Sequence, residues 1–309
     1  MAQKIKILVC DPVHEDGIEK LREAGFEVDI NPTITGEELK AKVPNYNALI
    51  VRSRTKVTKE IIEMGDSLKV IGRAGAGLDN IDVKAAEDKG IKVLNTPEAP
   101  AEAVAELTIG LMIALARGIP KADKAMKEGK WIKKKLIGWE LRGKTLGVIG
   151  LGNIGEKVAR IAKAIGMNIL IHKRRPPPPE LLKELEAEFI PLHELLQRSD
   201  VVTIHVPLTP ATHHMIGERE IQMMKDGAFL INTSRGAIVD EKALLKALQS
   251  GKLGGAALDV YEVEPPTDLA LVSLPNVVCT PHIGAQTREA QRMASVLMAE
   301  KIIDHFKGT

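Results

Sequence analysis

Residues 144–166, KTLGVIGLGNIGEKVARIAKAIG, decide the fold of this chain. The apolar run at residues 144–149 has the length and composition of a buried strand, and the amphipathic segment after residue 155 has the pattern of a helix. Between them lies the glycine-rich sequence GLGNIG, residues 150–155. A strand, a glycine turn and a helix in this order predict the start of a βαβ unit in a parallel sheet.

Each glycine of this turn has a separate physical role. Gly150 permits the tight turn, Gly152 lets the main chain approach a pyrophosphate, and Gly155 lets the helix pack closely on the strand. The free N–H groups at the helix start and the positive end of the helix dipole would then bind the phosphates. The stretch therefore predicts a dinucleotide site, and a glycine-rich turn that binds no ligand is the alternative.

Apolar runs alternate with amphipathic segments along the whole chain. The first set of runs lies near residues 5–10, 26–30, 48–51, 69–72 and 92–94. The second set comprises residues 144–149, 168–171, 201–206, 228–232, 255–258 and 277–279. This alternation predicts an α/β protein with two doubly wound parallel-sheet domains, a Rossmann cofactor domain and a flavodoxin-like substrate domain.

Prolines and a long apolar segment mark the boundary between the two sets of strands. Pro97 and Pro100 end the first set, and a mostly apolar helix is expected at residues 101–117. The last amphipathic segment is long enough to return to the first domain. We therefore expect a substrate-binding domain of residues 1–98 and 287–309, a dinucleotide-binding domain of residues 99–286, and an active site in the cleft between them. The apolar helix favours a homodimer.

The composition excludes several classes of protein. The 309 residues include 43 Lys and Arg against 41 Asp and Glu, so no overall field attracts nucleic acid or an anionic membrane. The two cysteines, Cys10 and Cys279, lie in apolar runs and are expected to be core residues in a reducing cytoplasm. We recognise no signal peptide, the apolar segment AVAELTIGLMIALA is too short to span a bilayer, and the histidine spacing predicts no metal site.

The segment NILIHKRRPPPPE, residues 168–180, gives the expected strand after the glycine turn an unusual end. An NAD-preferring site carries an acid here that accepts from the adenosine ribose, but this chain has Lys173, Arg174 and Arg175. Guanidinium groups can bind a 2′-phosphate in a fork, whereas a carboxylate would repel it. The loop therefore favours NADP(H). A solvated basic loop in an enzyme that also accepts NAD(H) is the alternative.

Polar residues follow three strands of the second set, in the segments LINTSRGAIVDEKAL, GAALDVYEVEPP and VVCTPHIGAQT. We expect Arg235, Asp259, Glu264 and His282 to gather at the carboxyl ends of a parallel sheet, where ligands bind. The guanidinium of Arg is always charged and can donate two parallel hydrogen bonds to a carboxylate. A histidine paired with a carboxylate is a typical proton donor. These residues predict a 2-hydroxy acid dehydrogenase, although a structural ion pair and a core histidine are the alternative.

The chain resembles the D-isomer-specific 2-hydroxy acid dehydrogenases nearly from end to end. The resemblance rests on GRAGAGLDNID, GLGNIG, INTSRGAIVDE, ALDVYEVEP and TPHIGA, which occur in the order of the family. It implies hydride transfer between a nicotinamide and C2 of the substrate. His282 would be the acid in reduction and the base in oxidation, and Glu264 would orient it. Arg235 would hold the substrate carboxylate and carbonyl, and Asp259 would contact the nicotinamide carboxamide.

The same resemblance implies further contacts for both ligands. The backbone N–H groups of the GAG turn would bind the substrate carboxylate, because small residues let the main chain approach an anion. This turn consists of Gly75, Ala76 and Gly77. On the cofactor side the resemblance adds Asn153 and Ile154 at the pyrophosphate, Val206 and Pro207 beside the adenosine, and Thr233 and Gly284 near the nicotinamide.

Two basic segments indicate the substrate. Arg52, Ser53 and Arg54 follow a strand of the first domain, and Lys133 begins a run of three lysines before the glycine turn. Both segments resemble those of phosphoglycerate dehydrogenases, whose lysine loop reaches across a dimer to help bind the phosphate. We therefore expect D-3-phosphoglycerate and 3-phosphohydroxypyruvate as substrates, the reaction of serine biosynthesis. A solvated basic face is the alternative for both segments.

Two other functions stay open. The basic loop at Lys173–Arg175 resembles the NADPH-dependent glyoxylate and hydroxypyruvate reductases, which is the second hypothesis. The third is a non-catalytic, dinucleotide-sensing protein, because the family also resembles a transcriptional corepressor with the same fold. The presence of all three catalytic residue types favours an enzyme over a sensor.

Overall fold

The computed structural model describes residues 4–308, which divide into two compact units. Unit 1 runs from the start of the described chain to Ala101 and from Ala285 to its end. Unit 2 comprises Glu102–Gly284. Because the second segment of unit 1 is the last part of the chain, both ends of the described chain belong to one unit.

A five-stranded parallel sheet forms the centre of unit 1, with the strand order β2-β1-β3-β4-β5. Its strands are β1 Lys6–Val9, β2 Glu27–Ile30, β3 Ala48–Val51, β4 Val70–Arg73 and β5 Lys92–Asn95. The four residues of β3 are all buried, as expected for a central strand that is covered on both faces. This order is the flavodoxin-like one.

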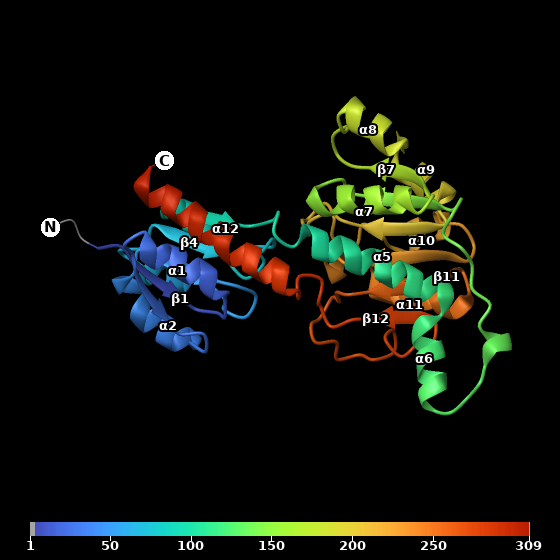
Figure 1. Ribbon diagram of the computed structural model, residues 1–309, viewed down its shortest axis with the longest axis horizontal. Coiled ribbons are helices and arrows are strands. Elements are labelled where there is room, and N and C mark those ends of the chain that lie inside the picture. Colours follow the sequence, from blue (N-terminus) through green and yellow to red (C-terminus); the bar gives the residue numbers. More distant parts are fainter. Residues whose placement is uncertain (1–3, 309) are drawn as a thin grey trace. The chain divides into compact units, whose positions relative to one another are not determined.

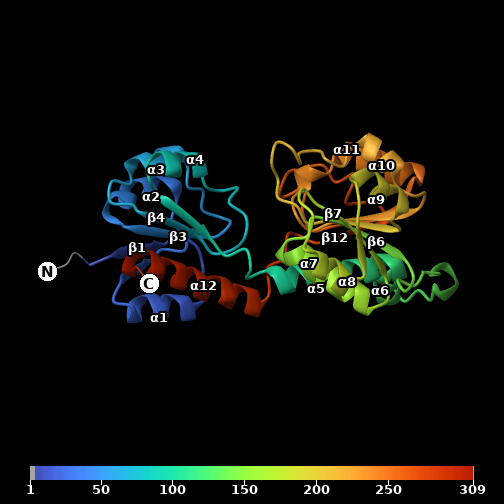
Figure 2. The same cartoon turned by 90° about the horizontal axis from the view of Figure 1, so that it is seen from above.

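Helices cover both faces of this sheet, as Figure 2 shows. One face carries α1 Glu15–Glu23 and α12 Arg288–Lys307, which lie side by side (Figure 1). The other carries α2 Gly36–Lys42, α3 Lys59–Met64 and α4 Val83–Asp88, with a short 3₁₀ turn at Val43–Asn45. Each face has its own apolar core, so the unit has the three layers of a doubly wound fold.

Unit 2 is built on a seven-stranded parallel sheet with the order β12-β11-β10-β9-β6-β7-β8. The strands are β6 Thr145–Ile149, β7 Asn168–His172, β8 Ala187–Phe189, β9 Val201–Ile204, β10 Ala228–Asn232, β11 Leu253–Leu258 and β12 Val277–Cys279. The chain reverses its direction of winding between β6 and β9, which are neighbours in the sheet. This reversal point is where dinucleotides bind in Rossmann folds.

The helices of unit 2 also lie on both faces of their sheet (Figure 2). One core contains α5 Ala101–Arg117, α7 Asn153–Ala164 and α8 Pro179–Leu185. The other contains α9 Leu192–Arg198, α10 Glu218–Met223 and α11 Glu241–Ser250. The remaining elements are α6 Ile119–Lys127 and the 3₁₀ turns Lys133–Lys135 and Gly236–Ile238. The expected pair of doubly wound parallel-sheet domains is confirmed.

The apolar helix expected at residues 101–117 is α5, and α6 follows it after Gly118. Gly118 has a positive φ of 61°, which separates the two helices. Within residues 4–308 no single helix is long and apolar enough to cross a membrane. Taken together, α5 and α6 have the length and the apolar composition that a membrane span needs, but the two helices are bent by 67° relative to each other.

The packing of α1 on α12 can be tested at a glycine. A Cβ atom at Gly17 in α1 would lie 2.5 Å from the Ser295 carbonyl oxygen, so backbone would have to move. At Gly36, the first residue of α2, a Cβ atom would meet nothing within 4 Å. We expect Gly17→Ala to lower the free energy of unfolding by about 1–3 kcal/mol through overpacking. The matched change Gly36→Ala should leave this free energy equal or raise it by up to about 1 kcal/mol.

Urea unfolding followed by circular dichroism measures both variants. Equal stability of Gly17→Ala and Gly36→Ala would contradict the close approach of α12 to α1.

Candidate cofactor and catalytic site

The glycine turn joins β6 to α7 and is fixed by close contacts. Gly150 has a φ of 95°, and a Cβ atom there would lie 2.5 Å from the His205 carbonyl oxygen. A Cβ atom at Gly155 would overlap the Gly150 carbonyl oxygen. Both positions therefore require glycine, the first for its backbone conformation and the second for the packing of α7 on the turn.

The start of α7 has the features that a phosphate group needs. Gly152 is the N-cap of this helix, and no side chain caps the helix there. A Cβ atom at Gly152 would meet nothing within 4 Å, so open space lies in front of the first N–H groups of the helix. Asn153 and Ile154 are the first two helical residues. The turn therefore fits a pyrophosphate, which would be bound by backbone donors and the helix dipole.

The basic loop lies beside this turn. β7 pairs with β6, and the Gly150 N–H donates to the His172 carbonyl over 2.8 Å. Lys173 Nζ donates to the Leu151 carbonyl over 3.2 Å, which holds this ammonium against the turn. Arg174 and Arg175 are exposed. The sheet thus brings the three cations to the same edge as the glycines.

The segment after β9 lies against the neighbouring strand end. The His205 N–H donates to the Ile149 carbonyl over 2.7 Å, and Ser234 Oγ donates to the Val206 carbonyl over 2.5 Å. Val206 is half-buried and Pro207 is exposed. Hydrogen bonds therefore fix this segment next to the glycine turn.

Asp259 organises the carboxyl end of β11. Its side chain is 1% exposed and accepts three hydrogen bonds from the chain after β12. Oδ1 accepts from Thr280 Oγ1 over 2.6 Å and from the Ile283 N–H over 2.8 Å, and Oδ2 accepts from the Gly284 N–H over 2.9 Å. A buried carboxylate needs such donors to offset its lost hydration. The Asp259 carboxylate therefore fixes the backbone on either side of His282.

His282 and Glu264 form a hydrogen-bonded pair. His282 Nδ1 lies 2.7 Å from Glu264 Oε2, and the His282 N–H donates to the Asp259 carbonyl over 2.8 Å. The backbone of His282 has a φ of 52°, an uncommon conformation for a residue with a side chain. With Nδ1 on the carboxylate, Nε2 is the nitrogen that can exchange a proton with a ligand. The histidine is paired and is not a core residue.

The charge of Glu264 is shaped by burial and by this pair. Burial raises the pKa of Glu264, whereas the hydrogen bond to His282, the charge of His282 and the hydrogen bond from the Tyr261 N–H lower it. The nearby charge of Arg235 acts in the same direction, so the pKa of Glu264 lies below its ordinary value of 4.5. The carboxylate is therefore ionised near neutral pH and can stabilise a protonated imidazole.

Arg235 follows β10, and hydrogen bonds to neighbouring residues hold both its carbonyl and its guanidinium. Its carbonyl accepts from Asn232 Nδ2 over 2.8 Å, and its Nη1 donates to the Ser234 carbonyl over 2.7 Å. A Cβ atom at the next residue, Gly236, would overlap the Tyr261 backbone, so this glycine lets the chain at Arg235 approach the segment that carries Glu264. The structure thus brings Arg235, Glu264 and His282 to one edge of the sheet.

Thr233 and Gly284 lie at the same edge, against α5. Thr233 Oγ1 is 2.9 Å from Thr108 Oγ1. A Cβ atom at Gly284 would lie 3.1 Å from both Asp259 Oδ2 and Val104 Cγ2. The helix therefore closes one side of the strand ends, and a residue larger than glycine at position 284 would have to displace it.

A cavity of about 530 Å³ adjoins the His282–Glu264 pair. It is lined by Tyr261, Glu264, Pro265, Pro266, Val272, Cys279, Thr280, Pro281 and His282. The expectation that Cys279 is a core residue is wrong, because this thiol is exposed at the cavity, whereas Cys10 is buried. β12 is an edge strand with only one neighbour in the sheet, so an apolar run there does not guarantee burial.

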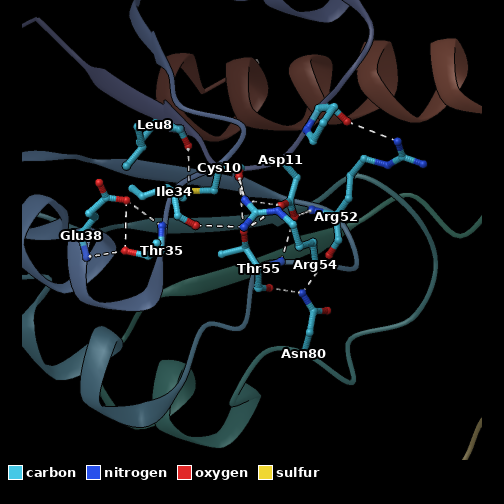
Figure 3. A network of polar contacts seen from close by, with 11 residues as sticks. Leu8, Cys10, Asp11, Ile34, Thr35, Glu38, Arg52, Arg54, Thr55 and Asn80 are labelled. Atoms are coloured by element: carbon cyan, nitrogen blue, oxygen red, sulfur yellow. Dashed lines mark hydrogen bonds and ion pairs between the residues drawn. The ribbon is translucent and has the colours of Figure 1, made fainter. Parts of the chain in front are cut away.

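The expected substrate residues of unit 1 follow two neighbouring strands. Arg52, Ser53 and Arg54 come after β3. Arg52 and Arg54 belong to the polar network of Figure 3. The GAG turn comes after β4, and its Gly75 has a φ of 142° and donates its N–H to Thr96 Oγ1 over 2.8 Å. Because β3 and β4 are adjacent, both segments lie at one edge of the sheet.

The structure adds one cation, Arg73, to the residues expected at this edge. The Arg73 guanidinium lies where a Cβ atom at Gly75 would be, directly against the GAG turn. The signal in the sequence is the arginine of GRAGAG, which lies two residues before the first glycine of the GAG turn. Lys133 is instead exposed after α6 and lines a different cavity from His282, one of about 380 Å³.

Glu264 gives stability a dependence on pH that can be measured. Its pKa is lower in the folded chain than its ordinary value of 4.5, so its contribution is present above that pH and is lost as the pH falls through the folded pKa. We expect the wild type to lose unfolding free energy relative to Glu264→Gln as the pH falls from about 7 to about 3. Urea unfolding at several pH values measures this difference. A difference that does not change with pH would contradict the ionised pair.

Comparisons with known proteins agree with this geometry. Residues 109–284 match the family model described as "D-isomer specific 2-hydroxyacid dehydrogenase, NAD binding domain". A solved glyoxylate reductase from Paecilomyes thermophila superposes with a TM-score of 0.91 at 34% identity, covering 99% of this chain and 96% of that chain. The fold and the resemblance expected from the motifs are confirmed.

Two relatives are more similar to this chain in sequence than that reductase is, and their names differ. The D-3-phosphoglycerate dehydrogenase of Methanocaldococcus jannaschii is 51% identical over 305 residues, which are 98% of this chain and 58% of the relative. The chain thus spans little more than half the length of that protein. The hydroxypyruvate reductase of Thermotoga maritima is 49% identical over 302 residues, 97% of both chains. The chain belongs to the D-isomer specific 2-hydroxyacid dehydrogenase family.

Proposed function

We propose that the chain transfers a hydride between a nicotinamide cofactor and C2 of a small D-2-hydroxy acid, with D-3-phosphoglycerate and 3-phosphohydroxypyruvate as its substrates. The observation that carries this proposal is the contact of 2.7 Å between His282 Nδ1 and Glu264 Oε2 at the carboxyl end of the sheet. Family membership supports the reaction type. The names of several relatives support the substrate pair.

The protein's own residues would handle the proton and the substrate. In reduction, His282 Nε2 would give a proton to the substrate oxygen, and in oxidation it would take that proton back. Glu264 would stabilise the imidazolium and keep Nε2 directed at the substrate. The Arg235 guanidinium would bind the substrate carboxylate and polarise the carbonyl. The nicotinamide ring, when bound, supplies the hydride in reduction or accepts it in oxidation.

The cofactor would lie along the carboxyl edge of the sheet in unit 2. Backbone N–H groups of Asn153 and Ile154 would bind its pyrophosphate, and Val206 and Pro207 would flank the adenosine. Thr233, Asp259 and Gly284 would lie near the nicotinamide. Asp259 Oδ2 accepts one hydrogen bond in the structure, so it keeps the capacity to accept a second from the carboxamide.

NADP(H) is the proposed preference, with NAD(H) as the alternative. Lys173 is held at the glycine turn through the Leu151 carbonyl, next to the exposed Arg174 and Arg175. The three positive charges of this loop, with no acid among residues 173–175, support binding of an adenosine 2′-phosphate. Guanidinium groups are well suited to bind that phosphate in a fork.

The substrate would use residues of unit 1 as well. We propose that Arg52 and Ser53 bind its phosphate and that the N–H groups of Ala76 and Gly77 bind its carboxylate, since the Gly75 N–H donates to Thr96 Oγ1. Lys133 would come from a second copy of the chain in a homodimer. The exposed apolar side chains near that lysine favour the dimer, since Met126, Trp131 and Ile137 are 57%, 78% and 93% exposed. Two free cysteines favour a reducing compartment such as the cytoplasm.

Reduction of glyoxylate or hydroxypyruvate is the second candidate function. It is favoured by the relative named hydroxypyruvate reductase, which matches this chain over 97% of both lengths. The basic loop at Lys173 supports it too, because NADPH is the usual electron source of reductive reactions. A non-catalytic sensor is less well supported, since Arg235, Glu264 and His282 lie together at one sheet edge.

Initial rates with phosphohydroxypyruvate, hydroxypyruvate and glyoxylate test the proposal. We expect the highest kcat/KM with the phosphorylated acid, and His282→Ala or Arg235→Ala should lower kcat by about 10²–10⁴-fold while cofactor still binds. His193→Ala is the control, because this histidine is exposed on α9. A preference for hydroxypyruvate would favour the second function, and absence of turnover with every 2-keto acid would exclude both enzymes.

The double change Arg174→Asp with Arg175→Ser tests the cofactor preference. Loss of charged hydrogen bonds to a 2′-phosphate should lower the ratio of kcat/KM for NADPH to that for NADH by about tenfold or more. Arg219→Ser is the matched control, because this arginine is exposed on α10. An unchanged ratio in the double variant would show that the basic loop does not recognise the phosphate.

A further inference from the structure

A buried carboxylate lies beneath the loop after β3. Asp11 is 1% exposed and sits two residues beyond the end of β1, the neighbour of β3 in the sheet. Its Oδ2 accepts the Arg52 N–H over 2.5 Å and the Thr55 N–H over 3.2 Å. Its Oδ1 accepts from Thr55 Oγ1 over 2.7 Å (Figure 3). One carboxylate thus holds the backbone at both ends of the segment that contains Ser53.

Arg54 completes this arrangement from the other side. Its Nη2 lies 3.0 Å from Asp11 Oδ1 and donates to the Cys10 carbonyl over 2.5 Å. Its Nη1 donates to the Ile34 carbonyl over 2.9 Å. Figure 3 shows the guanidinium surrounded by these oxygens. Three acceptors on two segments therefore occupy it, and it neutralises the buried charge of Asp11.

Asn80 holds the same loop from its outer side. Its Nδ2 donates to the Arg52 carbonyl over 2.8 Å and to the Thr55 carbonyl over 2.6 Å. The N–H of Arg52 is bound by Asp11 and its carbonyl by Asn80, so the peptide groups on both sides of this residue are fixed. A loop lacks the hydrogen bonds of a helix or a strand, so contacts of this kind are needed to hold its side chains in one position.

We propose that Asp11, Arg54 and Asn80 are positioning residues, which fix the Arg52–Ser53 backbone so that these two residues can bind the second anionic group of the substrate. This inference rests on the proposed function, since it assigns roles within the same substrate site. Arg54 then acts through Asp11, and Arg52 and Ser53 make the contacts to the anion. A loop that is ordered before binding loses less conformational entropy when the anion arrives, which strengthens binding.

Charge and geometry predict opposite results for one substitution. Asp11 is negative and lies close to the proposed anion site, so its neutralisation would favour an anion if only the charge mattered. Asp11→Asn keeps the size of the side chain but replaces one acceptor oxygen with a donor NH₂ group. With its oxygen on the Arg52 and Thr55 N–H groups, the amide would point its NH₂ group at the Arg54 guanidinium, which is also a donor. In the other orientation the NH₂ group would face the two backbone N–H groups themselves. If Asp11 positions the loop, anion binding must weaken despite the added positive charge.

Steady-state kinetics of the full chain with phosphohydroxypyruvate decide between these results. We expect Asp11→Asn and Asn80→Ala each to raise the KM for the phosphorylated acid about tenfold, with kcat within about twofold and the KM for the cofactor unchanged. Asn80→Ala leaves the net charge unchanged, so the two variants share only the loosened loop. Asp29→Asn is the control: this exposed carboxylate on β2 accepts from Tyr46 Oη over 2.7 Å and does not contact the loop.

A KM for the phosphorylated acid that falls or stays equal in Asp11→Asn would overturn the positioning role, while the wild-type turnover would leave the proposed function intact. Amide hydrogen exchange gives a second measurement that needs no turnover. The Arg52 and Thr55 amides should exchange faster in Asp11→Asn than in the wild type or in Asp29→Asn. Unchanged exchange at these amides would also overturn the inference. Faster exchange in Asp11→Asn, together with a wild type that shows no turnover, would locate the failure in the proposed function and leave the positioning role intact.

Discussion

The contact between the Asp259 carboxylate and the chain after β12 is the interaction on which the geometry of the His282–Glu264 pair depends. Asp259 is buried, and its oxygens accept the N–H groups of Ile283 and Gly284. These bonds, with the His282 N–H on the Asp259 carbonyl, hold His282 in a left-handed conformation. In that conformation Nδ1 lies 2.7 Å from Glu264 Oε2. A substitution at Asp259 would therefore disturb the contact between His282 and Glu264.

Unit 1 uses the same device. Asp11 and Asp259 each follow a parallel strand, each is 1% exposed, and each accepts two backbone N–H groups from the segment after the neighbouring strand. The neighbours are β3 for Asp11 and β12 for Asp259. A parallel sheet brings the carboxyl ends of its strands together, and the loops that leave these ends have N–H groups without ladder partners. A buried carboxylate satisfies several of them and is itself stabilised by them.

The cofactor edge of unit 2 depends instead on the absence of side chains. Gly150 and Gly155 allow the turn and α7 to come into contact, and Gly152 leaves open space before the helix. Backbone donors and a helix dipole then provide a site for phosphates whose charge needs no buried cation. The cations of the basic loop lie outside this core, attached through Lys173 to the Leu151 carbonyl. The charges of this loop can therefore change without any change in the fold.

The sequence by itself determined the alternation of strands and helices, the glycine turn and the set of polar residues that end the strands, because each depends on spacing along a short segment. Only the tertiary structure decided which partner each polar side chain has. Arg54 looked equivalent to Arg52 in the sequence, but its guanidinium is occupied by Cys10, Asp11 and Ile34. Cys279 looked like a core residue, but its strand is at an edge. Hydrogen bonds and burial of this kind join segments far apart in the chain, so local patterns do not contain them.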